Sequence, residues 1–214
     1  MDENLSKLRR EYLGTPLGDK TTNDSPIEQF KEWFNEIKSI ESKDPNAFSL
    51  ATCGKDLQPD LRLVLLKGIE NGDFIFFTNY NSKKGIQIIE NPKVSMNFYW
   101  PELHRQVRIQ GSALKLSVEE SKEYFYSRPQ GSQISAIVSP QSEKIASREI
   151  LEKSVKETLK NLSKNVPLEM PKQWGGFKIS PEKIEFWQGR ENRLHDRIQY
   201  TKNQENWLKT RLAP

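Results

Sequence analysis

Residues 47–67 read AFSLATCGKDLQPDLRLVLLK and contain two short apolar runs that include β-branched and aromatic residues. Gly54 and Pro59 stand between the runs, and residues of this kind commonly separate strands. We therefore predict strands at Ala47–Cys53 and Leu61–Lys67. The same pattern of short strands and turn residues continues along the chain and decides the class of fold.

The remaining elements follow from the same periodicities. Strands are predicted at Asp73–Asn79, Val94–Trp100, Gln106–Leu116, Gly176–Ile179, Ile184–Gln188, His195–Thr201 and Trp207–Arg211. Helices are predicted at residues 26–40, 82–91, 118–127, about 133–138 and about 147–163. The regular βαβ alternation of a parallel sheet is absent. We predict a mainly β, α+β fold: an antiparallel barrel with helices packed at its ends.

The first helix carries clear end signals. Residues 1–24 are polar and predict a flexible N-terminal arm, which leaves one domain over residues 25–214. Ser25 suits the N-cap, Pro26 suits the first helical position, and Glu28 would close a capping box. An apolar stripe follows at helical spacing, formed by Phe30, Trp33, Phe34, Ile37 and Ile40.

Composition narrows the function classes. The chain has 214 residues, of which 35% are hydrophobic and 29% charged, with a net charge of +4. The basic residues are spread among 29 acidic ones, so we expect no nucleic-acid partner. No signal-peptide pattern and no 18-residue apolar run occurs, and Cys53 is the only cysteine. We therefore expect a cytoplasmic protein without a membrane segment.

The stretch EFWQGRENRLHDR, residues 185–197, concentrates polar chemistry. In an extended strand, Arg193, His195 and Arg197 would share one face, since side chains alternate with a period of two. Two guanidiniums beside an imidazole suit an anionic, polar ligand that must be oriented. A cationic face on a solvated strand is the alternative interpretation.

Two further segments offer cations. Arg62 and Lys67 bracket an apolar strand whose faces we expect to be covered, so each cation needs an anion or a carboxylate partner. Ser82 can cap the helix that begins with Lys83 and Lys84, and its first N–H groups would add to an anion site. Structural ion pairs and an ordinary capped helix are the respective alternatives.

Residues 124–133, YFYSRPQGSQ, resemble a phosphate pocket more than a simple turn. Tyr124 and Arg128 lie four apart and would share a helical face. Pro129 disfavours helix at Arg128, so we expect a break there and a new helix with Ser132 as its N-cap. Neutral groups that suit a heteroaromatic ring or a ribityl chain are Gln106, Gln141 and Ser142.

Several chemistries find no support in the sequence. The two histidines are 91 positions apart and Cys53 stands alone, so we predict no metal site. The Gly-rich dinucleotide fingerprint, the P-loop and the Gly-x-Ser-x-Gly elbow are absent. A site for phosphate-bearing molecules without an evident nucleophile indicates that a bound cofactor supplies the reactive chemistry.

The segments, in this order, resemble the pyridoxamine 5′-phosphate oxidase family, which has the FMN-binding split-barrel fold. The motifs that carry the resemblance are RLVLLK, FTNYNSKKG, NPKVSMNFYW, RQVRIQG, YFYSRPQGSQI, QSEKIASRE, WGGF and EFWQGRENRLHDR. The match runs from RREY at residues 9–12 to Trp207 and RLAP at residues 211–214, which is nearly the whole chain. The resemblance implies FMN as cofactor and a homodimer in which both subunits build each active site.

The resemblance also implies roles for particular residues. The FMN-binding residues would be Arg62, Leu63, Val64, Leu65, Phe77, Thr78, Lys83, Lys84, Gln106, Gln141, Ser142, Trp187 and Arg197. The substrate-binding residues would be Arg9, Tyr12, Lys67, Tyr124, Arg128, Ser132, Arg193 and His195. Within the second set, Arg193 and His195 form the catalytic pair that orients and polarises the pyridine ring, while Arg9 and Tyr12 form a mobile cover.

The implied reaction is oxidation of pyridoxamine 5′-phosphate or pyridoxine 5′-phosphate to pyridoxal 5′-phosphate. Dioxygen would accept the electrons, giving hydrogen peroxide, and the amine would release ammonia. A split-barrel protein that binds FMN or a vitamin B6 phosphate without turnover is the alternative, followed by a nicotinamide-using flavin oxidoreductase. Positions that depart from the family pattern are Phe77, Lys83, Gln130 and Ser135.

Overall fold

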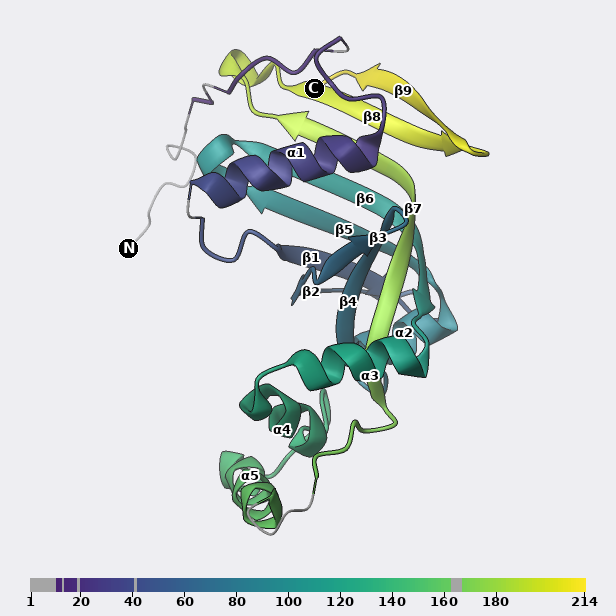
Figure 1. Ribbon diagram of the computed structural model, residues 1–214. Coiled ribbons are helices and arrows are strands. Elements are labelled where there is room, and N and C mark those ends of the chain that lie inside the picture. Colours follow the sequence, from purple (N-terminus) through teal and green to yellow (C-terminus); the bar gives the residue numbers. More distant parts are fainter. Residues whose placement is uncertain (1–10, 13, 19, 41, 163–166) are drawn as a thin grey trace. The chain divides into compact units, whose positions relative to one another are not determined.

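The computed structural model describes residues 11–214 except 13, 19, 41 and 163–166 (Figure 1). The chain divides into two compact units. Unit 1 contains the described residues up to Leu50, together with Ser95–Gly111 and Pro181–Pro214. Unit 2 contains Ala51–Val94 and Ser112–Ser180. The single domain over residues 25–214 and the flexible arm over residues 1–24 stay predictions, and residues 1–10 of that arm lie outside the described part.

Helices and strands follow the predicted order closely. The helices are α1 Pro26–Ser39, α2 Lys83–Glu90, α3 Val118–Ser127, α4 Gln130–Val138 and α5 Arg148–Leu162. The strands are β1 Ala47–Cys53, β2 Pro59–Leu65, β3 Gly68–Glu70, β4 Asp73–Asn79, β5 Lys93–Trp100, β6 Arg105–Lys115, β7 Trp174–Gln188, β8 Asp196–Asn203 and β9 Asn206–Leu212. Only β3 has no counterpart among the predicted strands.

The strands form one sheet in the order β2-β1-β5-β6-β7-β4-β3, with β8 paired to β7 and β9 paired to β8. Strand β7 pairs antiparallel with both β4 and β8. The pairs β3–β4 and β8–β9 are antiparallel as well. These pairings and the accompanying helices confirm the predicted α+β class.

In unit 1, α1 supplies the core side chains that its sequence stripe predicts. Phe30, Trp33 and Ile37 are buried, whereas Ile40 lies beyond the helix end and is exposed. The ring of Phe30 packs edge-on against Phe98 of β5, with 5.0 Å between the ring centroids. Trp33 packs edge-on against Phe186 of β7 at 5.1 Å. The stripe therefore fixes α1 to the strands of its own unit.

The N-terminus of α1 forms only half of the predicted capping box. The Ser25 hydroxyl accepts a hydrogen bond from the Glu28 backbone N–H at 3.3 Å. The Ser25 N–H donates to the Asn23 side chain at 3.1 Å, and the Glu28 carboxylate pairs with Lys31 at 2.7 Å. The local Asn23 turn thus satisfies the donor that Glu28 was expected to bind.

Strand β7 is longer than predicted. The sequence indicated two strands, at Gly176–Ile179 and Ile184–Gln188, and this was wrong because one strand spans Trp174–Gln188. Its pairing with β4 runs up to Ile179, and its pairing with β8 begins at Lys183. Pro181 therefore lies between these two ladders, where its missing N–H interrupts neither of them.

Strand β2 corrects another expectation. We expected both faces of this apolar strand to be covered, but within this chain the side chains of Leu61, Leu63 and Leu65 are exposed. Asp60, Arg62 and Val64 alternate with them and are half-buried. The strand stands at one end of the strand order, so one of its edges has no neighbouring strand.

Candidate active site

A cavity of about 420 Å³ in unit 2 collects many of the predicted site residues. Its lining includes Leu65, Lys67, Phe77, Thr78, Tyr124, Arg128, Ser132 and Gln141, all named from the sequence. The pairing of β4 with β7 sets one wall, because Phe77 lies opposite Gly176 and Asn79 lies opposite Trp174. Segments far apart in the sequence thus meet around one space.

Aromatic rings form one side of this cavity. Phe77 stacks on Tyr124 with 3.8 Å between ring centroids and on Trp174 with 5.5 Å. Trp174 was not among the predicted site residues. The signal that marks it is the pair of glycines after it: a Cβ on Gly176 would lie 2.9 Å from the Phe77 ring, so only glycine allows this close packing.

Arg128 and Lys67 are the charged residues in the cavity lining. The guanidinium of Arg128 lies 4.8 Å from the Trp174 ring centroid, and its Nη1 atom is buried without a hydrogen-bond partner in the described part of the chain. Burial lowers the pKa of Arg128 from its ordinary value. The Arg128 side chain lines the cavity, and a guanidinium with an unpaired N–H is a strong donor for an anion such as phosphate.

The turn between α3 and α4 forms partly as predicted. Arg128 has φ −76° and ψ 150°, the extended conformation that Pro129 imposes on the residue before it. The prediction that Ser132 caps the next helix was wrong, since α4 begins at Gln130 and Pro129 occupies the N-cap position. The Ser132 N–H already donates to the Pro129 carbonyl at 2.8 Å, so Ser132 lies within the first turn.

A second polar group in unit 2 surrounds Lys84, which is buried. Its Nζ atom lies 3.4 Å from side-chain oxygens of Thr78, Ser82 and Gln141. Burial lowers the pKa of Lys84, and the neighbouring charge of Arg62 lowers it further, while Asp60 raises it. The structure thereby places Thr78 and Gln141, two predicted FMN-binding residues, at 3.4 Å from the ammonium of Lys84, which is a third.

The start of α2 confirms the predicted cap. The Ser82 hydroxyl accepts from the Gly85 N–H at 3.3 Å, and Lys83 and Lys84 occupy the first turn. Arg62 lies in the same unit, donating from Nη1 to the Thr52 hydroxyl and pairing through Nη2 with Asp60 at 2.6 Å. Ser142 follows Gln141 in a turn and has a left-handed backbone, with φ 74°.

In unit 1, a cluster of rings surrounds His195. Its ring centroid lies 4.6 Å from that of Trp187 and 5.6 Å from that of Tyr12. Tyr12 also contacts His104, which the sequence did not single out, at 4.9 Å. Gln106 of β6 is half-buried in this unit. Arg9, the other residue predicted to form a cover with Tyr12, lies outside the described residues.

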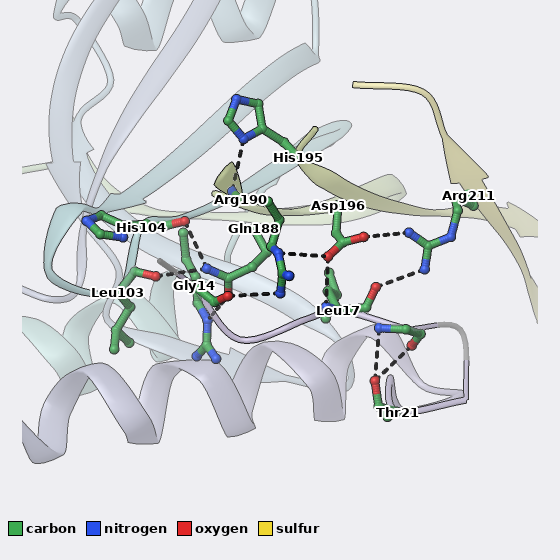
Figure 2. Close-up of polar contacts among 12 residues, drawn as sticks. Gly14, Leu17, Thr21, Leu103, His104, Gln188, Arg190, His195, Asp196 and Arg211 are labelled. Atoms are coloured by element: carbon green, nitrogen blue, oxygen red, sulfur yellow. Dashed lines mark hydrogen bonds and ion pairs between the residues drawn. The ribbon is translucent and has the colours of Figure 1, made fainter. Parts of the chain in front are cut away.

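The proton position on His195 follows from one hydrogen bond. Its Nδ1 atom accepts from the backbone N–H of Arg190 at 3.1 Å (Figure 2). The neutral imidazole must then carry its proton on Nε2, which makes Nε2–H a donor. Burial lowers the pKa of His195, and the charge of Arg193 lowers it further, so the neutral form is favoured.

Polar contacts also fix the segment before α1 onto this cluster (Figure 2). Arg190 donates to the Gly14 carbonyl at 2.9 Å. The Asp196 carboxylate accepts from the Leu17 N–H at 3.1 Å and pairs with Arg211 at 2.8 Å. These contacts connect residues 14–17 to the beginning of β8 and to β9.

The predicted common face of Arg193, His195 and Arg197 was wrong. Asn192 and Arg193 have φ values of 53° and 59°, and β8 begins only at Asp196. The chain must reverse direction between antiparallel strands, and these left-handed residues form that turn. Strand alternation therefore applies to Arg197 but not to Arg193 or His195.

Arg197 makes a bidentate pair with the buried Glu185. Its Nε and Nη2 atoms lie 2.9 and 3.1 Å from the two carboxylate oxygens, and Nη1 donates to the Ala213 carbonyl at 2.9 Å. The hydrogen bond to Glu185 raises the pKa of Arg197. The guanidinium thus has a structural role within unit 1, and its predicted FMN contact stays a prediction.

Comparison with known proteins decides the family. Residues 30–161 match the family model described as pyridoxamine 5′-phosphate oxidase, and residues 174–214 match the pyridoxine 5′-phosphate oxidase C-terminal dimerisation region. The chain belongs to the pyridoxamine 5′-phosphate oxidase family. The resemblance inferred from the sequence motifs is therefore confirmed.

Relatives within the pyridoxamine 5′-phosphate oxidase family match over the full length. The pyridoxine/pyridoxamine 5′-phosphate oxidase of Legionella pneumophila (strain Paris) is 48% identical over 210 residues, covering 98% of this chain and 97% of the relative. That of Trichormus variabilis (strain ATCC 29413 / PCC 7937) is 46% identical over 215 residues, covering 100% of both chains.

Solved structures confirm the split-barrel fold of this family. PhzG from Burkholderia lata 383, crystallised with tetrahydrophenazine-1-carboxylic acid, has a TM-score of 0.87 and 28% identity, covering 94% of this chain and 99% of that one. A pyridoxamine 5′-phosphate oxidase-related, FMN-binding protein from Nostoc punctiforme PCC 73102 has a TM-score of 0.69 and 18% identity, covering 89% and 98%. The second likeness bears on the fold alone. Among the described residues of this family member, no helix is long and apolar enough to cross a membrane.

Gly85 provides a test of the first turn of α2, which positions Lys84 in this family member. A Cβ at Gly85 would meet the Tyr80 carbonyl oxygen and lie 2.8 Å from the Asn79 oxygen, and these backbone atoms cannot move away easily. We expect Gly85→Ala to lower the free energy of unfolding by about 1–3 kcal/mol.

Gly131→Ala is the matched control for Gly85→Ala. Gly131 lies in the first turn of α4, and a Cβ there would meet nothing within 4 Å. We expect this change to raise the free energy of unfolding by about 0.5 kcal/mol, because alanine favours helix over glycine. Urea unfolding of both variants checks the pair; equal effects would contradict the packing argument.

Proposed function

We propose that this protein is an FMN-dependent oxidase that converts pyridoxamine 5′-phosphate and pyridoxine 5′-phosphate to pyridoxal 5′-phosphate. Dioxygen is the electron acceptor, hydrogen peroxide is released, and the amine substrate also yields ammonia. The observation that carries the proposal is the side chain of Arg128, which lines the cavity together with Lys67, Tyr124 and Ser132 and whose Nη1 atom has no hydrogen-bond partner in the described part of the chain. Family membership supports the same activity.

The residues near Lys84 suit the phosphate of FMN. Arg62, Lys83 and Lys84 are three cations, and the carboxylate that contacts two of them is Asp60. Lys84 is buried and its Nζ atom lies 3.4 Å from three neutral oxygens, a geometry that an incoming phosphate oxygen would improve. Thr78 and Gln141 would add donors for the ribityl chain. When bound, FMN supplies a two-electron acceptor that dioxygen regenerates.

The protein's own residues bind and orient the substrate in this proposal. The guanidinium of Arg128 and the ammonium of Lys67 attract the substrate phosphate, while the hydroxyls of Tyr124 and Ser132 donate to it. The Nε2–H of His195 donates to a polar substituent of the pyridine ring, and Arg193 supplies a positive charge beside it. Holding the ring in one orientation lowers the entropic part of the activation free energy.

We further propose that the protein is a cytoplasmic homodimer, with both subunits contributing to each active site. The match of residues 174–214 to a dimerisation region supports the homodimer. The exposed leucines of β2, at positions 61, 63 and 65, offer an apolar surface that a second subunit would cover. The single cysteine, Cys53, suits a reducing compartment.

Aerobic incubation of the purified protein with pyridoxamine 5′-phosphate tests the activity. We expect a yellow protein that produces pyridoxal 5′-phosphate and hydrogen peroxide in equal amounts. A yellow protein that binds the substrate without forming the aldehyde would support the non-catalytic alternative. Oxidation of a nicotinamide in place of the B6 phosphate would support the alternative of a nicotinamide-using flavin oxidoreductase.

The lowered pKa of His195 gives a pH dependence with a definite sign. Protonation would remove the Nδ1 lone pair that accepts from Arg190, so the charged imidazole is disfavoured in the folded protein. We expect kcat/KM to fall on acidification with an apparent pKa below the ordinary value of 6.5. His195→Asn should remove that acid limb.

The free energy of unfolding should also fall on acidification. The unfolded chain binds a proton on His195 more readily than the folded one, so this group stabilises the fold above its unfolded pKa and loses that contribution as pH falls. Rate profiles and urea unfolding between pH 5 and pH 8 measure both effects (the range brackets the usual histidine pKa, about 6.5). If the acid limb persists in His195→Asn, another titratable group is responsible for it.

A further inference from the structure

Asp60 lies among the cations that the proposed function assigns to the FMN phosphate. Its carboxylate is 2.6 Å from Nη2 of Arg62 and 3.2 Å from Nζ of Lys83. One carboxylate oxygen, Oδ2, makes both contacts. Neither the motifs nor the family match assigns a function to this side chain.

The local structure holds Asp60 in this position. Asp60 and Arg62 are two residues apart on β2 and therefore point to the same face of the strand. Lys83 reaches the carboxylate from the first turn of α2. The other side of Arg62 is fixed as well, because its Nη1 atom donates to Thr52, whose hydroxyl donates to Gln87 at 2.6 Å.

The charges around Asp60 explain why a carboxylate is favourable there. Burial acts to raise the pKa of Asp60, but the hydrogen bond from Lys83 and the charges of Arg62 and Lys83 together lower it below 3.8. The same carboxylate opposes the repulsion between Arg62 and the buried Lys84. Without any anion, three like charges would be held close together, which disfavours the folded arrangement.

This arrangement differs from an ordinary surface salt bridge. The side chains of Asp60 and Arg62 are 29% and 18% exposed, so water screens their attraction less than it would on an open surface. The carboxylate also contacts two cations at once. An anion that neutralises an anion-binding cluster necessarily opposes a second anion that enters the same cluster.

We propose that Asp60 is an internal counter-ion that occupies the phosphate-binding cations in the flavin-free protein and thereby sets the affinity for FMN. The inference rests on the proposed function, since it takes Arg62, Lys83 and Lys84 as the FMN phosphate site. It has two consequences of opposite sign. Asp60 stabilises the flavin-free fold, and it weakens the binding of a phosphorylated flavin.

The test compares FMN with riboflavin, which lacks the phosphate. Flavin is removed from the full-length protein, and each flavin is titrated back while its fluorescence is followed. We expect Asp60→Asn to lower the Kd for FMN about tenfold and to leave the Kd for riboflavin unchanged. Asp73→Asn makes the same change of charge at the start of β4 and should alter neither value.

Thermal unfolding of the flavin-free protein provides a second measurement. We expect Asp60→Asn to melt below the wild type, and inorganic phosphate to raise its Tm more than that of the wild type, because phosphate replaces the lost carboxylate. Asp60→Ser serves as the second variant if the amide is not tolerated. It should show the same two effects.

The outcomes separate this inference from the proposed function. A wild-type protein that fails to bind FMN would refute the proposed function. A wild-type protein that binds FMN, with Asp60→Asn showing equal or weaker FMN affinity, would overturn the role of Asp60 alone. Equal tightening of FMN and riboflavin would also overturn it, because the effect would then not act through the phosphate.

Discussion

Arg128→Ala is expected to raise the KM for pyridoxamine 5′-phosphate about 100-fold, with a much smaller change in kcat. The reason is that Arg128 offers a buried nitrogen, Nη1, that has no hydrogen-bond partner in the described part of the chain. Losing it removes a charge-assisted hydrogen bond to the substrate phosphate. The phosphate lies away from the reacting carbon, so the loss affects capture more than the chemical step.

Two variants control for changes in packing at Arg128. Its guanidinium also lies over the Trp174 ring, so alanine removes a contact as well as a charge. Arg128→Lys keeps the charge but not the planar fork and should recover part of the lost affinity. Arg148→Ala removes an arginine from the exposed surface of α5 and should leave KM unchanged. Steady-state kinetics with a peroxide-coupled assay measures all three, and an unaltered KM in Arg128→Ala would end the phosphate assignment.

Local signals predicted the helices and most strands well. The N-caps Ser25 and Ser82 and the apolar stripe of α1 depend on neighbouring residues only, and each is found where the sequence placed it. The extent of β7 could not be found in this way. Pro181 indicates a break when it is considered alone, whereas the strand continues because Pro181 falls between two ladders.

The candidate site, like the fold, was predicted from the sequence in part. The residues around the unit 2 cavity were named because whole motifs matched a family, and the structure brings them together. Trp174 was missed because its place in the cavity wall depends on the two glycines that follow it and on Phe77, which is distant in the sequence. The common face of Arg193, His195 and Arg197 failed because strand periodicity was extended across a turn. Exposure of the β2 leucines was also beyond prediction, since it depends on what lies against the strand.

Arg193→Ala is expected to lower kcat/KM about 100-fold while FMN stays bound in full. Arg193 is exposed at the end of the turn Glu191–Arg193, and its charge lowers the pKa of His195. Its removal should therefore affect the substrate and His195 but not the flavin phosphate, which the proposal assigns to residues of unit 2. The flavin-to-protein absorbance ratio and steady-state kinetics measure the two effects separately.

A pH profile distinguishes this role from that of an ordinary surface arginine. Burial lowers the pKa of His195 most and the charge of Arg193 lowers it further, so the acid limb of kcat/KM should shift part of the way toward 6.5 in Arg193→Ala. Arg193→Lys keeps the charge and should leave the limb in place while recovering only part of the rate, since an ammonium cannot make the bidentate contacts of a guanidinium. The exposed position predicts a change in unfolding free energy of less than about 0.5 kcal/mol. Unchanged turnover with an unshifted acid limb would show that Arg193 does not contact the substrate and does not influence the charge of His195. The turn that contains Arg193 would then serve only to connect β7 with β8.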